Sequence, residues 1–409
     1  MKKVLAILLC IVLVITFTAC TTNETVLSED IVLSDEENTD AENTTLGDEE
    51  TDTTNTALPV KTSKTRKPTT VRTTTAETKY TLPKEGYTRV TAPITTLVEE
   101  NKIRFIGRTY SYVLDDSRKM VYGNTGFQLE GDLSGDVMVE LYVEKASCAI
   151  NIVVDGKHQV EWVQKGYKTL YLAKNLSKGN HTITVTKGTA HHAGELSIES
   201  VTFSGVLKTP KAEKLQIEFI GDSVTVGEGM YGAQQQFNSL AETYNTYDGY
   251  AAKVARNLSA GVSTVAYCGA KVPGIKTSFL DETWDFASNK KDIVVINMGT
   301  NDLGWSNISL SDVEDTLRAD CMALIKAVRQ KYGKDTYIVW AYGMMFDKDK
   351  AFFKEVTEQY AKNNNDKRVL FCDLSAAKDN AGNASHPSQK GNDKAADILT
   401  KFLKEKCDV

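Results

Sequence analysis

The chain has 409 residues, of which 41% are hydrophobic and 25% are charged, and its formal net charge is −6. Most of this charge lies in the N-terminal segments. The rest of the chain is close to neutral, which argues against a nucleic-acid partner. The seven cysteines are scattered and have no metal-ligand spacing with histidines or carboxylates, so we expect neither a disulfide framework nor a metal site, and no other cofactor.

Residues 1–20 are predicted to be a targeting segment that is not part of the fold. Two lysines precede an apolar run, Val4 to Phe17, which has signal-peptide length and is shorter than a full membrane span. The run ends in Phe17-Thr18-Ala19-Cys20, which resembles a bacterial lipobox, where the cysteine becomes the lipidated N-terminus. We therefore expect an extracellular protein. It is either lipid-anchored through Cys20 on the bacterial cell surface, its only contact with the membrane, or secreted after cleavage near Ala19.

Residues 21–93 are predicted to be a disordered linker. Twelve acidic residues and no lysine or arginine lie between residues 21 and 52, whereas basic residues dominate between residues 53 and 79. Threonine is abundant and aromatic residues are few. This composition favours a stalk, open to O-glycosylation, that holds the folded part away from the envelope. A regulatory binding arm is the alternative.

Residues 94–208 are predicted to form a β-sandwich of the jelly-roll kind, because many short runs alternate apolar and polar residues between turn signals. Asp155-Gly156 is a strong two-residue hairpin signal between two such runs. His191 and His192 are adjacent in this region. Neighbouring residues of a strand face opposite ways, so we expect a solvated pair and not a metal site.

Residues 212–409 are predicted to form a three-layer, flavodoxin-like α/β domain around a parallel sheet. Five apolar runs have the character of buried parallel strands, at residues 215–220, 262–267, 293–298, 337–341 and 369–372. Helical patterns separate them. The clearest of these patterns has one apolar stripe, formed by Val313, Leu317, Cys321, Leu324 and Val328.

The loops after these strands carry the residues that could perform chemistry. Gly221-Asp222-Ser223 ends the first strand, Cys268-Gly269 follows the second, and Gly299-Thr300-Asn301 follows the third. Of the five histidines, only His386 lies after Ser223. A serine becomes a nucleophile only when a base and a site for an oxyanion lie beside it, and these loops can supply both.

The order G-D-S, glycine, G-T-N-D and a late H-P-S resembles that of the SGNH (GDSL-type) hydrolases, over roughly residues 215–409. This resemblance implies that Ser223 is the nucleophile and that His386 acts as base and then as acid. It also implies an oxyanion hole formed by the backbone N–H groups of Ser223 and Gly269 and by the side-chain amide of Asn301.

One position departs from the family pattern. Most members have an aspartate three residues before the histidine, and this chain has Asn383 there. An amide stabilises an imidazolium less than a carboxylate does. Two alternatives follow. Another group, such as Asp379 or a backbone carbonyl, orients His386 and leaves a Ser–His dyad, or the site is crippled.

A jelly roll followed by an SGNH domain resembles carbohydrate esterase family 2, and the phrase at residues 176–183 resembles one found in jelly-roll modules attached to such enzymes. The resemblance implies an esterase that removes O-acetyl groups from plant polysaccharides or oligosaccharides of the xylan or glucomannan type. We expect this protein to be a monomer. Trp305 and Tyr342 are candidates for stacking on a sugar ring. The alternative is a carbohydrate-binding surface lipoprotein with lost or minimal catalysis. A lipase or thioesterase would need a deep apolar pocket for the acyl chain, and the sequence has no long apolar loop to line one.

Overall fold

The computed structural model describes residues 72–73, 88–91, 97, 100–111, 118–232, 240–304 and 308–409. All of them lie within one unit of the chain, Pro68–Val409. The predicted targeting segment, the lipobox cysteine Cys20 and most of the predicted linker lie outside the described residues, as does Trp305. Among the described residues, no helix is both long and apolar enough to cross a membrane.

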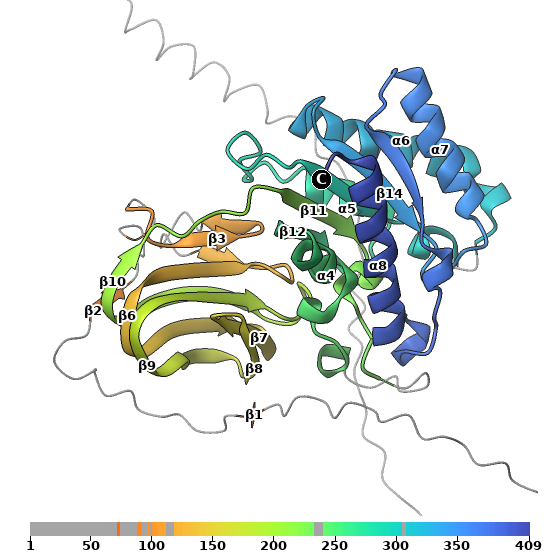
Figure 1. Ribbon diagram of the computed structural model, residues 1–409. Helices are drawn as coiled ribbons and strands as arrows, with labels where there is room; N and C mark the ends of the chain where they lie inside the picture. Colours follow the sequence, from red (N-terminus) through yellow and green to blue (C-terminus); the bar gives the residue numbers. More distant parts are fainter. Residues whose placement is uncertain are drawn as a thin grey trace, which may run out of the picture. The chain divides into compact units, whose positions relative to one another are not determined.

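The N-terminal part is rich in strands, as the alternating runs predict (Figure 1). Its strands are β1 (Arg72–Thr73), β2 (Thr88–Thr91), β3 (Arg104–Ile106), β4 (Thr109–Ser111), β5 (Arg118–Met120), β6 (Gly126–Glu144), β7 (Cys148–Val154), β8 (Lys157–Val163), β9 (Gly166–Lys187) and β10 (Glu195–Lys208).

Long, bent strands build this β-sandwich. Strand β6 pairs with both β9 and β10, and the register shifts between Leu133 and Met138. Such irregularities bend a strand, so that one strand can serve two parts of the sheet. The turn at Asp155-Gly156 joins β7 to β8 with positive φ at both residues, 49° and 79°, which confirms the predicted hairpin.

The sheet begins earlier in the chain than predicted. Strand β2 lies within the predicted linker, yet it pairs antiparallel with β10, with Val90 opposite Val201. The composition of residues 21–93 is that of a disordered chain, but Thr88-Arg89-Val90-Thr91 is rich in β-branched residues, which suit a strand when a sheet edge is available. The boundary at residue 94 is therefore too late.

The C-terminal part alternates strands and helices. Its strands are β11 (Gln216–Gly221), β12 (Gly261–Ala266), β13 (Ile293–Asn297), β14 (Tyr337–Tyr342) and β15 (Val369–Asp373). Its helices are α3 (Ser223–Val226), α4 (Tyr250–Asn257), α5 (Val272–Phe279), α6 (Leu310–Tyr332), α7 (Lys350–Asn363) and α8 (Gln389–Lys406), with short helical turns η1 (Leu240–Thr243), η2 (Thr246–Asp248), η3 (Thr300–Gly304), η4 (Ser375–Ala377) and η5 (Asn383–Ser385).

The five strands are parallel and lie in the order β12-β11-β13-β14-β15, which is the flavodoxin-like order. Helices α4 and α8 pack on one face of this sheet, and α5, α6 and α7 pack on the other (Figure 1). The order reverses at β11, so the carboxyl ends of β11 and β13 flank the crevice where such sheets bind ligands. The predicted three-layer fold is confirmed.

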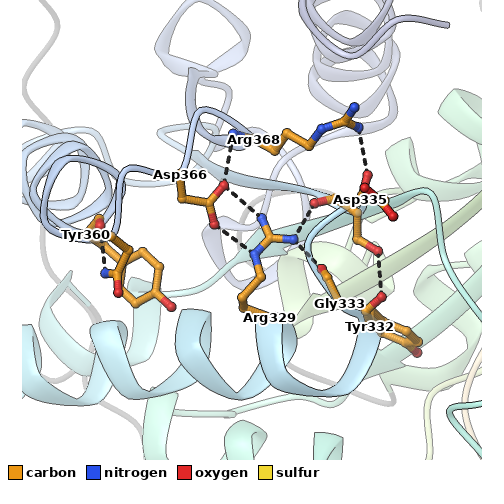
Figure 2. Close-up of polar contacts among 9 residues, drawn as sticks. Arg329, Tyr332, Gly333, Asp335, Tyr360, Asp366 and Arg368 are labelled. Atoms are coloured by element: carbon orange, nitrogen blue, oxygen red, sulfur yellow. Dashed lines mark hydrogen bonds and ion pairs between the residues drawn. The ribbon is translucent and has the colours of Figure 1, made fainter.

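Helix α6 carries the predicted apolar stripe into the core, where Leu317, Cys321, Leu324 and Val328 are buried. The helix ends at Gly333, whose φ of 87° lies in the region that favours glycine. Arg329 fixes this end by donating to the carboxylate of Asp366 and to the backbone oxygen of Thr336 (Figure 2). The five described cysteines are all free thiols.

Candidate active site

Ser223 lies at the first position of α3, directly after β11. Asp222 caps this short helix, because its carboxylate accepts a hydrogen bond from the Val224 N–H at 2.9 Å. A side chain at Gly221 would place its Cβ 2.0 Å from the Thr225 hydroxyl oxygen, so only glycine fits this tight turn. The turn places the Ser223 hydroxyl at the carboxyl-terminal edge of the sheet. Ser223 is nearly buried there, with an exposed fraction of 5%.

His386 lies against this serine. Its Nε2 is 2.8 Å from the Ser223 Oγ, and its Nδ1 is 3.2 Å from the backbone oxygen of Asn383. A carbonyl oxygen can only accept, so the proton of the neutral ring belongs on Nδ1, and Nε2 is left to accept from the serine hydroxyl. This tautomer is the one that a general base for Ser223 requires.

The loop that carries His386 is held in a strained conformation. Ala384 and Ser385 have φ values of 48° and 59°, in the left-handed region that non-glycine residues rarely adopt. Backbone hydrogen bonds hold the loop, from the Asn383 N–H to Gly229 O at 2.8 Å and from the Gly382 N–H to His386 O at 2.9 Å. Strain of this kind persists where surrounding structure imposes it, and it is common at active sites.

Hydrogen bonds tie Asn301, an expected oxyanion donor, to the loops that carry Ser223 and Gly269. Asn301 follows β13 in the π-helical turn η3, and its Nδ2 donates to Ala270 O at 3.0 Å and contacts the Asp222 carboxylate at 3.4 Å. It is therefore tied to the residue before the nucleophile and to the residue after Gly269. Gly269 is exposed with a φ of 77°, and no atom lies within 4 Å of where its Cβ would be. Gly269 thus lies on an open loop, one residue before the carbonyl that accepts from Asn301.

Two buried carboxyl groups flank these donors. Burial, opposed by the hydrogen bond from the Val224 N–H and reinforced by the charge of Asp302, raises the pKa of Asp222 to about 7. Burial also raises the pKa of Asp302, to about 6. Asp302 anchors the neighbouring loop, because its carboxylate accepts from the Val272 N–H at 3.1 Å.

Two sequence predictions at this site are wrong. Asp379 does not orient His386, because its carboxylate accepts from the Ser388 hydroxyl and from the Ala381 N–H at 2.9 Å and so fixes the loop. Tyr342 is not an open platform for a sugar, because it is 2% exposed and its ring lies 4.4 Å from that of Phe353 in the core.

Asn383 takes part in the site through its backbone. Its carbonyl oxygen faces the His386 Nδ1, whereas its side chain is fully buried and neither polar atom of the amide has a hydrogen-bond partner. Of the two predicted orienting groups, the structure thus offers a backbone carbonyl. The contact does not depend on which side chain occupies position 383.

The sequence analysis missed Glu228. This residue is 5% exposed, and its Oε2 lies 3.9 Å from the His386 Nε2. It lies between Gly227 and Gly229, whose φ values of 83° and 73° turn the chain sharply back toward the site. In the sequence, Gly227, Gly229 and Gly232 mark this turn, but an ordinary flexible loop has the same pattern of glycines.

The β-sandwich also reaches this end of the sheet. The Ala190 N–H donates to the Tyr244 hydroxyl at 2.9 Å, and the His191 ring lies 5.1 Å from that of Tyr267, which precedes the loop of Gly269. Burial lowers the pKa of His191 to about 4. His191 is therefore half-buried against the α/β part, in contrast to the predicted solvated pair, while His192 is exposed.

Comparison with known proteins gives the same two parts. Residues 219–394 match the GDSL-like Lipase/Acylhydrolase family, and residues 105–210 match the carbohydrate esterase 2 N-terminal family. The cellulase/esterase CelE of Acetivibrio thermocellus is 29% identical to this chain over the matched region. That region covers 62% of this chain and 34% of the length of CelE. The acetylxylan esterase / glucomannan deacetylase of Cellvibrio japonicus is 26% identical over 62% of the chain and 77% of its own length.

The fold has counterparts among solved structures. A family two carbohydrate esterase from Clostridium thermocellum, solved in complex with cellohexaose, superimposes with a TM-score of 0.65. It is 25% identical, and the match covers 74% of this chain and 98% of the other. With both domain families matched in the expected order, this chain is an SGNH hydrolase of the carbohydrate esterase family 2 type.

Proposed function

We propose that this protein is a serine esterase that removes O-acetyl groups from plant polysaccharides, through Ser223 and His386 acting as a dyad. The observation that carries the proposal is the pair of contacts at His386, with Nε2 2.8 Å from the Ser223 Oγ and Nδ1 facing the Asn383 carbonyl. This arrangement presents a base in hydrogen-bond reach of a hydroxyl nucleophile, already in the required tautomer.

The reaction follows from these positions. The Ser223 Oγ attacks the acetyl carbonyl carbon while its proton passes to the His386 Nε2, and the N–H groups of Ser223, Gly269 and Asn301 stabilise the oxyanion. His386 then protonates the departing sugar oxygen, which leaves an acetyl ester on Ser223. A water molecule attacks this ester while its proton passes to His386. The bond between the acyl carbon and the Ser223 Oγ then breaks, His386 returns the proton to Oγ, and acetate leaves. Asn301 must exchange its 3.4 Å contact with Asp222 for the oxyanion, which costs little because that contact is long.

The substrate class is supported by the relatives, which include an acetylxylan esterase / glucomannan deacetylase and an esterase solved with cellohexaose. Acetate release from acetylated xylan, acetylated glucomannan and a simple aryl acetate, measured beside Ser223→Ala, tests the proposal. Release that vanishes in the variant is the expected result. Retained glycan binding without release from any of the three would favour a carbohydrate-binding surface protein.

The location is a separate part of the proposal. The lipobox-like sequence at Cys20 supports a protein that is lipid-anchored on the outer face of a bacterial cell or secreted, and we propose that this protein is a monomer. Fatty-acid labelling of cells that express the wild type or Cys20→Ser tests this. Label that appears only in the wild type, with the protein accessible to added protease on intact cells, is expected for the anchored form.

A further inference from the structure

We infer that Glu228 is a positioning residue of this active site, whose carboxylate stabilises the positive charge that His386 acquires when it takes the Ser223 proton. The inference deepens the proposed function and rests on it. The proton itself passes from the Ser223 Oγ to the His386 Nε2 and stays there, and Glu228 contributes charge only. Asn383, being neutral, cannot provide that charge from the Nδ1 side of the ring.

The geometry supports this role directly. The Glu228 Oε2 lies 3.9 Å from the same nitrogen that receives the proton, and both side chains are more than nine-tenths buried. Two opposite charges at this separation interact far more strongly in a buried site than in water. The imidazolium therefore forms beside a carboxylate that is already in place, which favours the transition state over the neutral ground state.

The backbone explains how Glu228 comes to lie there. The Glu228 N–H donates to Ser223 O at 3.0 Å, so the loop folds back onto the nucleophile helix. A Cβ at Gly229 would lie 2.5 Å from the Asn383 oxygen and 3.1 Å from the His386 Cβ. The absence of a side chain at Gly229 thus lets this loop pack closely against the His386 loop, with Glu228 as the neighbouring residue.

The surroundings keep the carboxylate oriented. Burial, reinforced by the neighbouring Glu228 charge, raises the pKa of the Cys268 thiol above its usual range, and this protonated thiol is hydrogen-bonded to Glu228. Burial lowers the pKa of His192, and the negative charge of Glu228 opposes that decrease. The Glu228 carboxylate therefore also interacts electrostatically with His192 of the β-sandwich. The Cys268 thiol therefore holds the Glu228 carboxylate from one side.

The test compares wild type, Glu228→Gln and Glu228→Asp in hydrolysis of 4-nitrophenyl acetate and in covalent labelling of Ser223 by an uncharged fluorophosphonate. Glu228→Gln keeps the size and a hydrogen-bond acceptor but removes the charge. We expect kcat to fall about 10- to 100-fold with KM within about twofold, and labelling to slow by a similar factor. Glu228→Asp, which keeps the charge but withdraws it by one methylene, should lie between the two. Glu242→Gln, the same change at an exposed glutamate of η1, is the matched control and should equal the wild type.

Unchanged kcat and labelling in Glu228→Gln would overturn the inference, and so would a rise in KM alone, which would make Glu228 a substrate contact. If Glu228→Gln failed to fold, a wild-type labelling rate in Glu228→Asp would overturn it as well. Failure of the proposed function would look different. The wild type would then release no acetate from any ester, while the labelling rates would still show whether Glu228 assists the Ser223–His386 pair.

Discussion

Arg108 of the β-sandwich forms a bidentate ion pair with Glu218 in the strand that leads to the nucleophile. The Arg108 Nε lies 2.9 Å from the Glu218 Oε1 and its Nη2 lies 2.8 Å from Oε2, and both side chains are fully buried. Burial opposes ionisation of Glu218, and the guanidinium outweighs it, so the pKa of Glu218 lies below its ordinary value. Ser263 and Tyr332 also donate to this carboxylate, at 2.9 and 2.8 Å.

Removing one partner of this pair should destabilise the whole unit. Arg108→Ala leaves Glu218 buried without its charge partner, and we expect a loss of about 3–5 kcal/mol in the free energy of unfolding. Arg108→Met combined with Glu218→Gln should lose less than Arg108→Ala alone, because no uncompensated charge remains. Urea unfolding followed by circular dichroism measures both. A loss below about 1 kcal/mol in Arg108→Ala would contradict the prediction.

The roles at the catalytic serine predict a clear ranking of variants. Ser223→Ala should abolish turnover with the fold intact, and His386→Ala should cost at least about 10⁴-fold in kcat. Asn383→Ala should cost less than about 10-fold, because the carbonyl that accepts from the His386 Nδ1 remains in place. Kinetics with an aryl acetate rank the three. If Asn383→Ala were as damaging as His386→Ala, a dyad that is independent of the side chain at 383 would be wrong.

The raised pKa of Asp222 predicts a pH dependence of stability. A carboxyl whose pKa is higher in the folded state, about 7 here against an ordinary 3.8, holds its proton more tightly when folded. The free energy of unfolding should therefore fall as the pH rises from about 4 to about 7, by up to about 4 kcal/mol from this group. Asp222→Asn removes the titration while keeping an acceptor for Val224, so its curve should be flatter. Unfolding at pH 4.5 and 7.5 gives the comparison, and equal slopes would refute it.

The close approach at Gly229 makes a fourth prediction. Gly229 and Gly156 have similar positive φ values, 73° and 79°, but a Cβ at Gly156 meets nothing within 4 Å whereas one at Gly229 strikes the Asn383 oxygen. Gly156→Ala should cost only about 1 kcal/mol of backbone strain and leave kcat unchanged. Gly229→Ala should also displace the His386 loop and lower kcat by about 100-fold or more. Equal kcat in the two variants would show that the loops can separate without consequence.

Much of this structure could be predicted from the sequence because its signals are local. Buried parallel strands need continuous apolar runs, and all five in the α/β part lie within one residue of the predicted bounds. Ser223 follows from the motif at the end of the first of these strands, and His386 from the late H-P-S motif before the last helix. The predicted pairing of these two residues in space depends on the fold, and the structure brings them to 2.8 Å.

The wrong predictions concern residues whose surroundings depend on tertiary packing, which a local sequence pattern does not reveal. Tyr342 lies two residues after Trp340, so in a strand both rings face the same side, and both pack on Phe353 of α7. Tyr342 is therefore a core residue, as Trp340 is. Asp379 and Glu228 lie on loops whose direction depends on backbone angles that no sequence pattern reveals. The sequence could therefore not show that Glu228, and not Asp379, lies beside His386.

The acceptor at the His386 Nδ1 is a main-chain oxygen, and every amino acid has one. Position 383 can therefore change during evolution without loss of ring orientation, provided that the new side chain fits the buried space of Asn383 and the number of residues in the loop stays constant. Insertions and deletions between Asp379 and His386 would be purged, whereas substitutions at 383 would accumulate. Among homologues, loop length would be a better guide to an intact site than the presence of an aspartate.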